Sequence, residues 1–152
     1  MKYYSTNNKK VLVDFREATI KGQPEDKGLY FPERVPQLSS DFLDRIEKYT
    51  KEEIAFTIIA PYVGDSIPSD YLKSIVKETI DFPFPLIKVN ENISSLELFH
   101  GPTLAFKDVG ARFMSRCLSY FLQNNTREVT VLVATSGDTG GAVANGFYGV
   151  EG

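Results

Sequence analysis

The residue of this sequence best suited to covalent chemistry is a lysine. It lies between a segment with the pattern of a short strand and a segment with the pattern of a helix. Lys107 follows a bend at Gly101-Pro102 and lies at the expected start of a helix. A cation there opposes the helix dipole, and we expect flanking Ala105 and Phe106 to help exclude water from the amine. A partly deprotonated amine can form a Schiff base with an aldehyde cofactor. On local physics alone, an exposed lysine beside a helix-capping Asp108 is the alternative.

A glycine-rich loop, ATSGDTGG from Ala134 to Gly141, is the second segment suited to chemistry. Its glycines allow close backbone approach, and the first amides of a following helix favour a carboxylate or phosphate. The candidate binding residues are Thr135, Ser136, Gly137, Thr139 and Gly140. The spacing fits neither a Walker A sequence nor a Rossmann fingerprint. A plain strand-to-helix turn capped by Thr139 is the alternative. Asp138 would repel an anion, so we expect it to face away or to contact another group of the ligand.

The elements that must position these segments fall into two parts. An irregular opening segment with a turn-rich stretch at 21–28 comes first. Three runs of helical periodicity follow, near 39–49, 54–62 and 69–80, the last capped by Ser69. Pro83 and Pro85 then break the pattern. We therefore assign residues 1–83 to an N-terminal helical subdomain and residues 84–152 to the beginning of an α/β domain.

The second part alternates strand and helix patterns. Strands are expected at 86–89 and 96–99, a helix from Lys107 or Asp108 to about 123, a strand covered on both faces at 128–134, and a helix at 139–148. A doubly wound sheet needs several parallel strands, and only 128–134 has the apolar, β-branched composition of one. The α/β domain is thus expected to be incomplete.

Composition excludes several classes of function. The net charge of -3 gives no basic surface for nucleic acid. With one cysteine, Cys117, and one histidine, His100, we expect no disulfide, no metal site and a reducing compartment. We find no signal-peptide or membrane-spanning pattern and expect a cytoplasmic protein.

The two chemical segments resemble those of one family. LELFHGPTLAFKDVGARFM (96–114) resembles the cofactor-lysine segment of threonine synthases, and ATSGDTGGAVA (134–144) resembles their substrate loop. Tyr4-Ser5-Thr6, GLYFPE (28–33) and VGDSIP (63–68) are similar to the same family. The resemblance implies the tryptophan-synthase-β-like fold, fold type II of pyridoxal-phosphate enzymes. It also implies a carbon–oxygen lyase reaction in threonine biosynthesis, in which O-phospho-L-homoserine and water give L-threonine and phosphate.

The resemblance further implies roles for individual residues. Lys107 would form the Schiff base with pyridoxal phosphate and shuttle protons, beside Phe106, and Asp138 would lie near the cofactor ring hydroxyl. Ser136 to Gly140 would grip the substrate carboxylate. Arg112 could meet the substrate phosphate, with an exposed helix arginine as the alternative. His100 could orient the lysine loop or merely stabilise it.

The family pattern also sets an expectation about completeness. Family members are longer, and their cofactor-phosphate loop and the residue facing the pyridine nitrogen follow the matched part. We therefore expect this polypeptide alone to bind pyridoxal phosphate weakly or not at all, to lack turnover, and to need its own C-terminal part as a partner. A non-catalytic N-terminal fragment and a threonine-synthase-like phospho-lyase are the alternatives.

Overall fold

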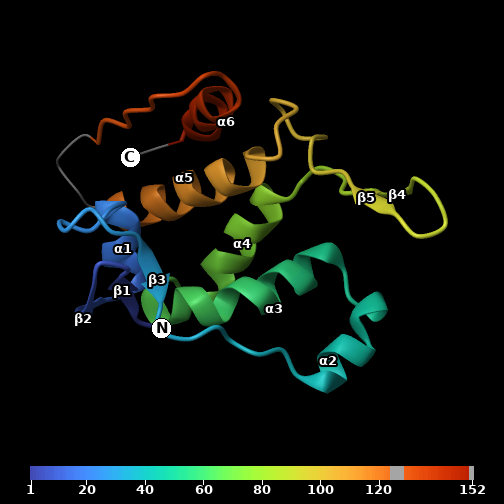
Figure 1. Ribbon diagram of the computed structural model, residues 1–152, viewed down its shortest axis with the longest axis horizontal. Coiled ribbons are helices and arrows are strands. Elements are labelled where there is room, and N and C mark those ends of the chain that lie inside the picture. Colours follow the sequence, from blue (N-terminus) through green and yellow to red (C-terminus); the bar gives the residue numbers. More distant parts are fainter. Residues whose placement is uncertain (124–128, 151–152) are drawn as a thin grey trace. The chain divides into compact units, whose positions relative to one another are not determined.

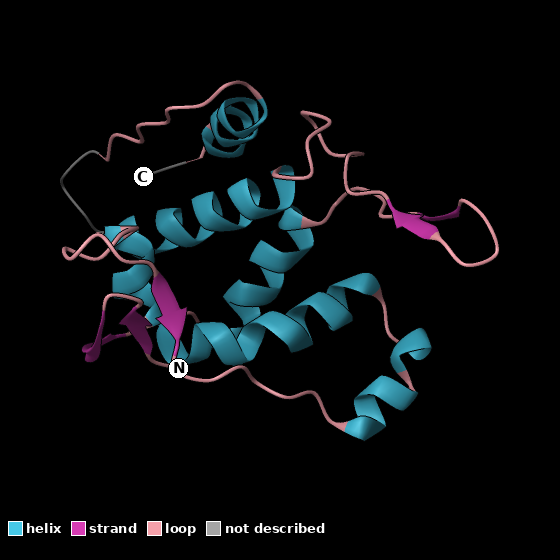
Figure 2. Ribbon diagram, in the orientation of Figure 1, coloured by secondary structure: helices cyan, strands magenta, loops and turns pink. Residues whose placement is uncertain are grey.

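The computed structural model describes residues 1–123 and 129–150. It contains two compact units, Met1–Val76 and Lys77–Gly152, each with helices and strands (Figures 1 and 2). The division between the subdomains at residues 83 and 84 stays a prediction.

The N-terminal unit opens with a three-stranded antiparallel sheet that the sequence analysis did not predict. Strands β1 (Tyr3–Ser5), β2 (Asn8–Val13) and β3 (Tyr30–Pro32) pair in the order β2-β1-β3. Helix α1 (Phe15–Lys21) lies between β2 and β3 in the chain and is capped by Asp14, whose carboxylate accepts the Glu17 amide. The opening of the chain is therefore ordered into regular elements, and the prediction of an irregular segment was wrong.

The helical runs expected next are present with shifted ends. The first is divided into α2 (Ser40–Asp44), capped by Ser39, and a short 3₁₀ helix η1 (Ile46–Lys48). Helix α3 (Lys51–Val63) begins at a capping box formed by Thr50 and Glu53, and η2 (Gly64–Ser66) follows it. Helix α4 (Ser69–Thr79) begins one residue earlier than expected, because Ser69 is its first residue and not its cap. The carbonyl of Pro68 accepts the Leu72 amide instead.

Buried apolar side chains hold the N-terminal unit together. Within residues 1–76 they come from the sheet and from helices α2 to α4: Tyr3, Val13, Phe42, Val63, Ile67, Leu72, Ile75 and Val76. The hydroxyl of Tyr3 donates to the carbonyl of Tyr62 over 2.7 Å, which joins the sheet to the end of α3. The periodicity prediction for α4 is confirmed, because Leu72, Ile75 and Val76 are almost fully buried.

The second unit consists of a hairpin and two packed helices. Strands β4 (Leu86–Lys88) and β5 (Ser94–Leu96) pair antiparallel, so the second strand begins two residues before the predicted one. Helix α5 (Asp108–Leu122) begins where expected and packs against α6 (Asp138–Phe147). Its buried face includes Ala111, Cys117 and Phe121.

The predicted covered strand at 128–134 is not seen in the described residues. Residue 128 lies outside them, and 129–134 form no strand, with Leu132 89% exposed. A parallel strand is held by ladder hydrogen bonds to its neighbours, and within 1–123 and 129–150 no strand lies beside this segment. Its composition is that of a strand, but no described strand pairs with it.

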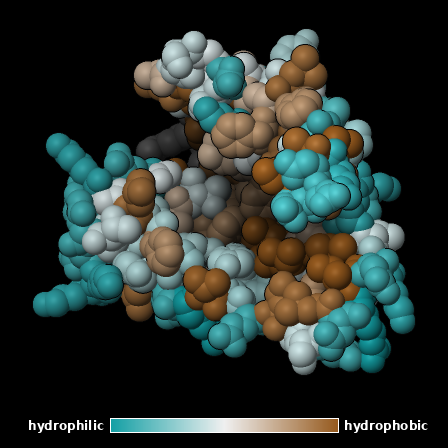
Figure 3. Space-filling model, turned by 45° about the vertical axis from the view of Figure 1, so that its right-hand side comes forward, coloured by the Kyte–Doolittle hydropathy of each residue, from teal (hydrophilic) through white to brown (hydrophobic). Residues whose placement is uncertain are grey.

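Large apolar side chains are also exposed elsewhere (Figure 3). Leu86, Leu104 and Tyr148 are each more than two-thirds exposed. None of the helices in the described part of the chain is both long and apolar enough to cross a bilayer.

Candidate active site

The segment before Lys107 is folded into two consecutive turns. The Leu104 amide donates to the carbonyl of Gly101 over 3.1 Å, and the Asp108 amide donates to that of Ala105 over 3.0 Å. Leu104 has a φ of 59°, a left-handed conformation that is uncommon for a residue with a side chain. Backbone conformations of this kind concentrate at functional sites.

Asp108 fixes these turns from inside. Its side chain is 1% exposed, and its two carboxylate oxygens accept the amide of Thr103 over 2.9 Å and the hydroxyl of Thr103 over 2.5 Å. Gly101 leaves room for this carboxylate, since a Cβ there would lie 2.6 Å from an Asp108 oxygen. Asp108 thus ties the loop to the first turn of α5, directly after Lys107 at the N-terminal cap of that helix.

Lys107 reaches across to the other helix. Its Nζ donates to the hydroxyl of Thr139, in the first turn of α6, over 2.6 Å, and it lies 5.5 Å from the centre of the Phe106 ring. Phe106, Lys107 and Thr139 line a cavity of about 340 Å³ together with residues of helices α5 and α6. The remaining lining residues are small or apolar: Gly110, Ala111, Met114, Ala142 and Val143. The amine therefore lies at the wall of an apolar cavity, and the predicted site residues Lys107, Phe106 and Thr139 are brought together.

The glycine-rich loop is organised by Thr135. Its hydroxyl oxygen accepts the amides of Gly137 over 3.2 Å and Gly140 over 3.3 Å. A Cβ on Gly140 would lie 2.4 Å from the Thr135 methyl group, so this close approach requires glycine. Gly137, at the cap of α6, has a φ of 155°, which also favours glycine. Helix α6 begins at Asp138, and Thr139 is inside it, not at its cap.

Arg116 and Gly146 hold α5 against α6. A guanidinium nitrogen of Arg116 donates to the carbonyl of Gly146 over 3.0 Å, and its Nε lies 3.3 Å from the Glu78 carboxylate. A Cβ on Gly146 would lie 3.0 Å from backbone atoms of Ala111. The close approach of the helices sets the distance between Lys107 and Thr139.

Arg112 is engaged within its own unit. Its side chain is 13% exposed, pairs with Asp81 over 3.0 Å, and donates to the carbonyl of Glu78 over 2.5 Å. The alternative prediction of a solvated helix arginine is wrong, and Arg112 does not line the cavity beside Lys107.

The remaining predicted residues lie outside the cavity lining. His100 pairs with Glu97 over 2.7 Å and stacks on Phe99, before the loop that Asp108 fixes. Ser136 and Asp138 are exposed. Within the described residues, no group of three or more histidine, cysteine, aspartate or glutamate side chains could hold a metal ion.

Residues 2–80, more than half of the chain, match the family model described as threonine synthase N terminus. The chain belongs to the threonine synthase family. It is 42% identical to threonine synthase of Haemophilus influenzae and 40% identical to that of Escherichia coli, over 99% of its own length. It spans about 35% of the length of each of these relatives.

Solved structures of the family agree with the fold. The crystal structure of Escherichia coli threonine synthase matches 99% of this chain with a TM-score of 0.91 at 40% identity, and the chain covers 35% of it. A threonine synthase from Brucella melitensis, solved with pyridoxal phosphate bound, matches with a TM-score of 0.92 at 36% identity, over 99% of this chain and 34% of that one. The resemblance inferred from the two motifs is confirmed, and the mixed helix and strand fold is that of the N-terminal part of threonine synthases.

Sequence reasoning missed the contacts that hold this segment in shape. Thr103 and Gly146 were not singled out, Arg116 was expected to reach solvent or a ligand, and Asp108 was considered only as a helix cap. For Asp108, the sequence signal that could have indicated its role was its position directly after the candidate lysine and before residues at helical spacing. Arg116 and Gly146 are 30 residues apart, so local periodicity carries no information about their contact.

Proposed function

We propose that this chain supplies the cofactor lysine of a threonine synthase, which converts O-phospho-L-homoserine and water to L-threonine and phosphate with pyridoxal phosphate. The observation that carries the proposal is Lys107, held at the wall of an apolar cavity by Thr139 in a chain of this family. The cytoplasmic location expected from the sequence remains part of the proposal.

The cavity fits the cofactor in size and chemistry. An aromatic ring needs an apolar space beside the amine that binds its aldehyde, and the side chains of Phe106, Met114 and Val143 line a cavity of about 340 Å³. Pyridoxal phosphate, when bound, supplies an electron sink that stabilises negative charge on the substrate carbons. Lys107 would hold its aldehyde carbon, with Asp138 near its ring hydroxyl.

The chain's own residues would then act on the substrate. Lys107 moves protons between substrate carbons, and Thr139 receives its hydrogen bond and keeps the amine aimed into the cavity. The loop from Ser136 to Gly140 binds the substrate carboxylate with the hydroxyls of Ser136 and Thr139 and with amides at the start of α6. Thr135 accepts the amides of Gly137 and Gly140 and so holds the loop in shape. A role for Arg112 at the substrate phosphate requires it to leave Asp81.

A chimaera tests the proposal directly. Residues 1–150 replace the matching third of Escherichia coli threonine synthase, and phosphate release and threonine formation from O-phospho-L-homoserine are measured. We expect activity in the chimaera, none in its Lys107→Ala variant, and full activity in the matched control Lys88→Ala, which alters the exposed strand β4. An active Lys107→Ala variant would remove the assignment of the cofactor lysine.

The same assay separates the alternatives. A phospho-lyase would release an oxoacid and ammonia in place of threonine. For the isolated 152-residue chain, borohydride reduction in the presence of pyridoxal phosphate, followed by peptide mass spectrometry, is expected to give little specific label. Efficient labelling of Lys107 would show that this segment binds the cofactor unaided.

A further inference from the structure

A second cavity lies entirely within the N-terminal unit. It has a volume of about 240 Å³ and is formed by β1, β2, the end of α1 and the turn that leads to β3. It shares no residue with the cavity beside Lys107. Its apolar wall comes from Val11, Val13 and Pro24. The proposed reaction makes no use of it.

One side of this cavity is fixed by a tight turn. The Ser5 hydroxyl, which is buried, donates to the Asp26 carboxylate over 2.6 Å, and the Gly28 amide donates to the same oxygen over 3.0 Å. The hydrogen bond from Ser5 and, to a smaller extent, the one from Gly28 lower the pKa of Asp26. A Cβ on Gly28 would lie 2.2 Å from the Ser5 oxygen, so the turn closes only with glycine. The cavity is therefore built by specific contacts and not by a loose loop.

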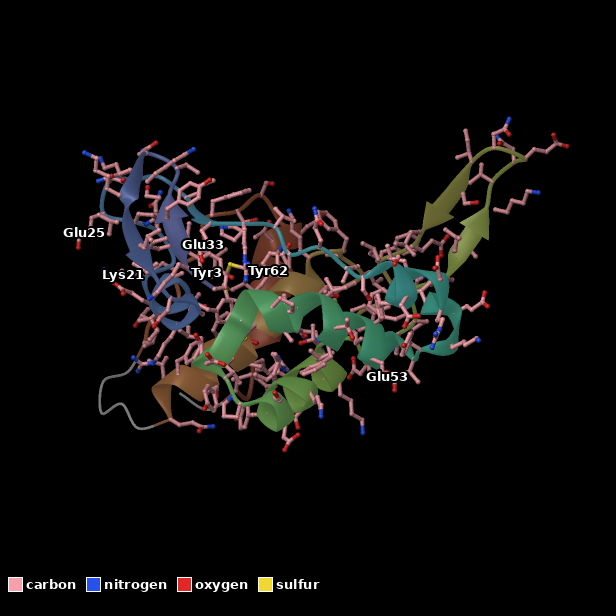
Figure 4. The ribbon with its side chains drawn as sticks, turned by 90° about the horizontal axis from the view of Figure 1, so that it is seen from below. Tyr3, Lys21, Glu25, Glu33, Glu53 and Tyr62 are labelled. Carbon is pink, nitrogen blue, oxygen red and sulfur yellow. The ribbon has the colours of Figure 1, made fainter. Side chains whose placement is uncertain are left out.

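Opposite charges lie next to each other at its rim. Lys21 pairs with Glu17 over 2.8 Å, and this contact is the main cause that raises the pKa of Lys21, while Tyr30 and Glu25 also contribute. Both of these lesser contributors line the cavity. Figure 4 shows Lys21 and Glu25 on the same side of the N-terminal unit. Among the described residues, no hydrogen bond or ion pair is made by the Glu25 carboxylate.

We propose that this cavity binds a small aliphatic α-amino acid as its zwitterion. Glu25 receives the ammonium group, Lys21 exchanges its exposed ion pair with Glu17 for the ligand carboxylate, and the aliphatic side chain packs on Val11, Val13 and Pro24. Among the lining residues, one cation faces two anions, Glu25 and Asp26, so a simple anion is disfavoured and a ligand with an ammonium group is favoured. The volume is below that of sites for drug-sized ligands, which suits a molecule of this size.

Titration of the 152-residue chain with L-norvaline, followed by two-dimensional ¹H–¹⁵N NMR, tests the proposal. We expect saturable shifts at the amides of Val13, Lys21 and Tyr30. N-acetyl-L-norvaline lacks the ammonium group and L-norvalinamide lacks the carboxylate. Each is therefore expected to bind more weakly, by up to about fivefold, the upper end for an exposed ion pair. Equal binding of all three compounds would overturn the zwitterion assignment.

Two variants and their matched controls locate the contacts. Glu25→Gln and Lys21→Gln are each expected to weaken L-norvaline binding by up to about fivefold, while Glu33→Gln and Lys10→Gln, which alter residues outside the lining, leave it unchanged. Shifts that do not saturate, or that are unaffected by the first two variants, would show that this cavity is not an amino-acid site. All four side chains are exposed, and the dispersion of the spectrum reports directly that each variant is folded. Because this unit does not contain Lys107, the outcome is independent of the proposed reaction.

Discussion

Replacement of Asp108 by asparagine tests whether this carboxylate fixes the loop before Lys107. The substitution keeps the shape of the side chain but removes its charge, and its amide nitrogen cannot accept a hydrogen bond. Asp108 accepts two hydrogen bonds from Thr103, at 2.9 and 2.5 Å, in a site that is 1% exposed. A bond to a charged group contributes about 1.5–3 kcal/mol, and asparagine can keep only one of the two. We therefore expect the free energy of unfolding to fall by about 1.5–3 kcal/mol.

Urea unfolding of the 152-residue chain, followed by far-UV circular dichroism, measures this loss. Hydrogen exchange at the Thr103 amide should accelerate in the variant, because its acceptor has been replaced. Glu91→Gln is the matched control, since it removes a carboxylate from the exposed turn between β4 and β5. If Asp108→Asn unfolds at the same urea concentration as the wild type and leaves exchange at Thr103 unchanged, the carboxylate does not hold the loop.

Three further outcomes are expected. Burial raises the pKa of the Cys117 thiol to about 12, so iodoacetamide at neutral pH should modify it only when urea unfolds the chain, and rapid labelling of the folded protein would contradict this. Burial, with a smaller contribution from Tyr62, raises the pKa of Tyr3 from 10.0 to about 12. The contribution of neutral Tyr3 to stability is therefore complete below pH 10 and is lost as the pH rises through 12. The free energy of unfolding should fall across this interval, and it should fall less in Tyr3→Phe. Gly146→Ala should destabilise the packing of α5 on α6 by about 1–3 kcal/mol, because its Cβ would lie 3.0 Å from the Ala111 backbone. Gly141→Ala, in the same helix with open space around it, should cause no loss, and equal losses in urea unfolding would refute the close contact.

The local sequence pattern was enough to predict helices with an apolar stripe or a recognisable start. Helix α4 was predicted from its apolar stripe, and the start of α5 from the lysine segment. The N-terminal sheet was missed because β1 and β3 are three residues long, too short to show an alternating pattern, and because Asn8–Val13 does not alternate. At 129–134 the composition favoured a strand, but strand formation depends on neighbours that a sequence window does not contain.

The site was predictable in its residue types and not in its geometry. Lys107 and the loop from Thr135 to Gly140 were identified from motif resemblance. The hydrogen bond between Lys107 and Thr139 spans 32 residues and depends on the packing of two helices, which periodicity alone does not fix. The ion pair of Arg112 with Asp81 has the same origin, since it joins a helix to the preceding segment.

The unpaired segment at 129–134 has a practical consequence for work with this polypeptide. Val129, Val131 and Val133 are about two-fifths exposed, Leu132 is almost fully exposed, and the six residues contain neither a charge nor proline. Uncharged β-branched segments of this length pair readily with copies of themselves. Concentrated samples of the 152-residue chain should therefore form fibrils that bind thioflavin T, and Leu132→Lys should delay their formation. Purification and storage at low concentration follow from this property.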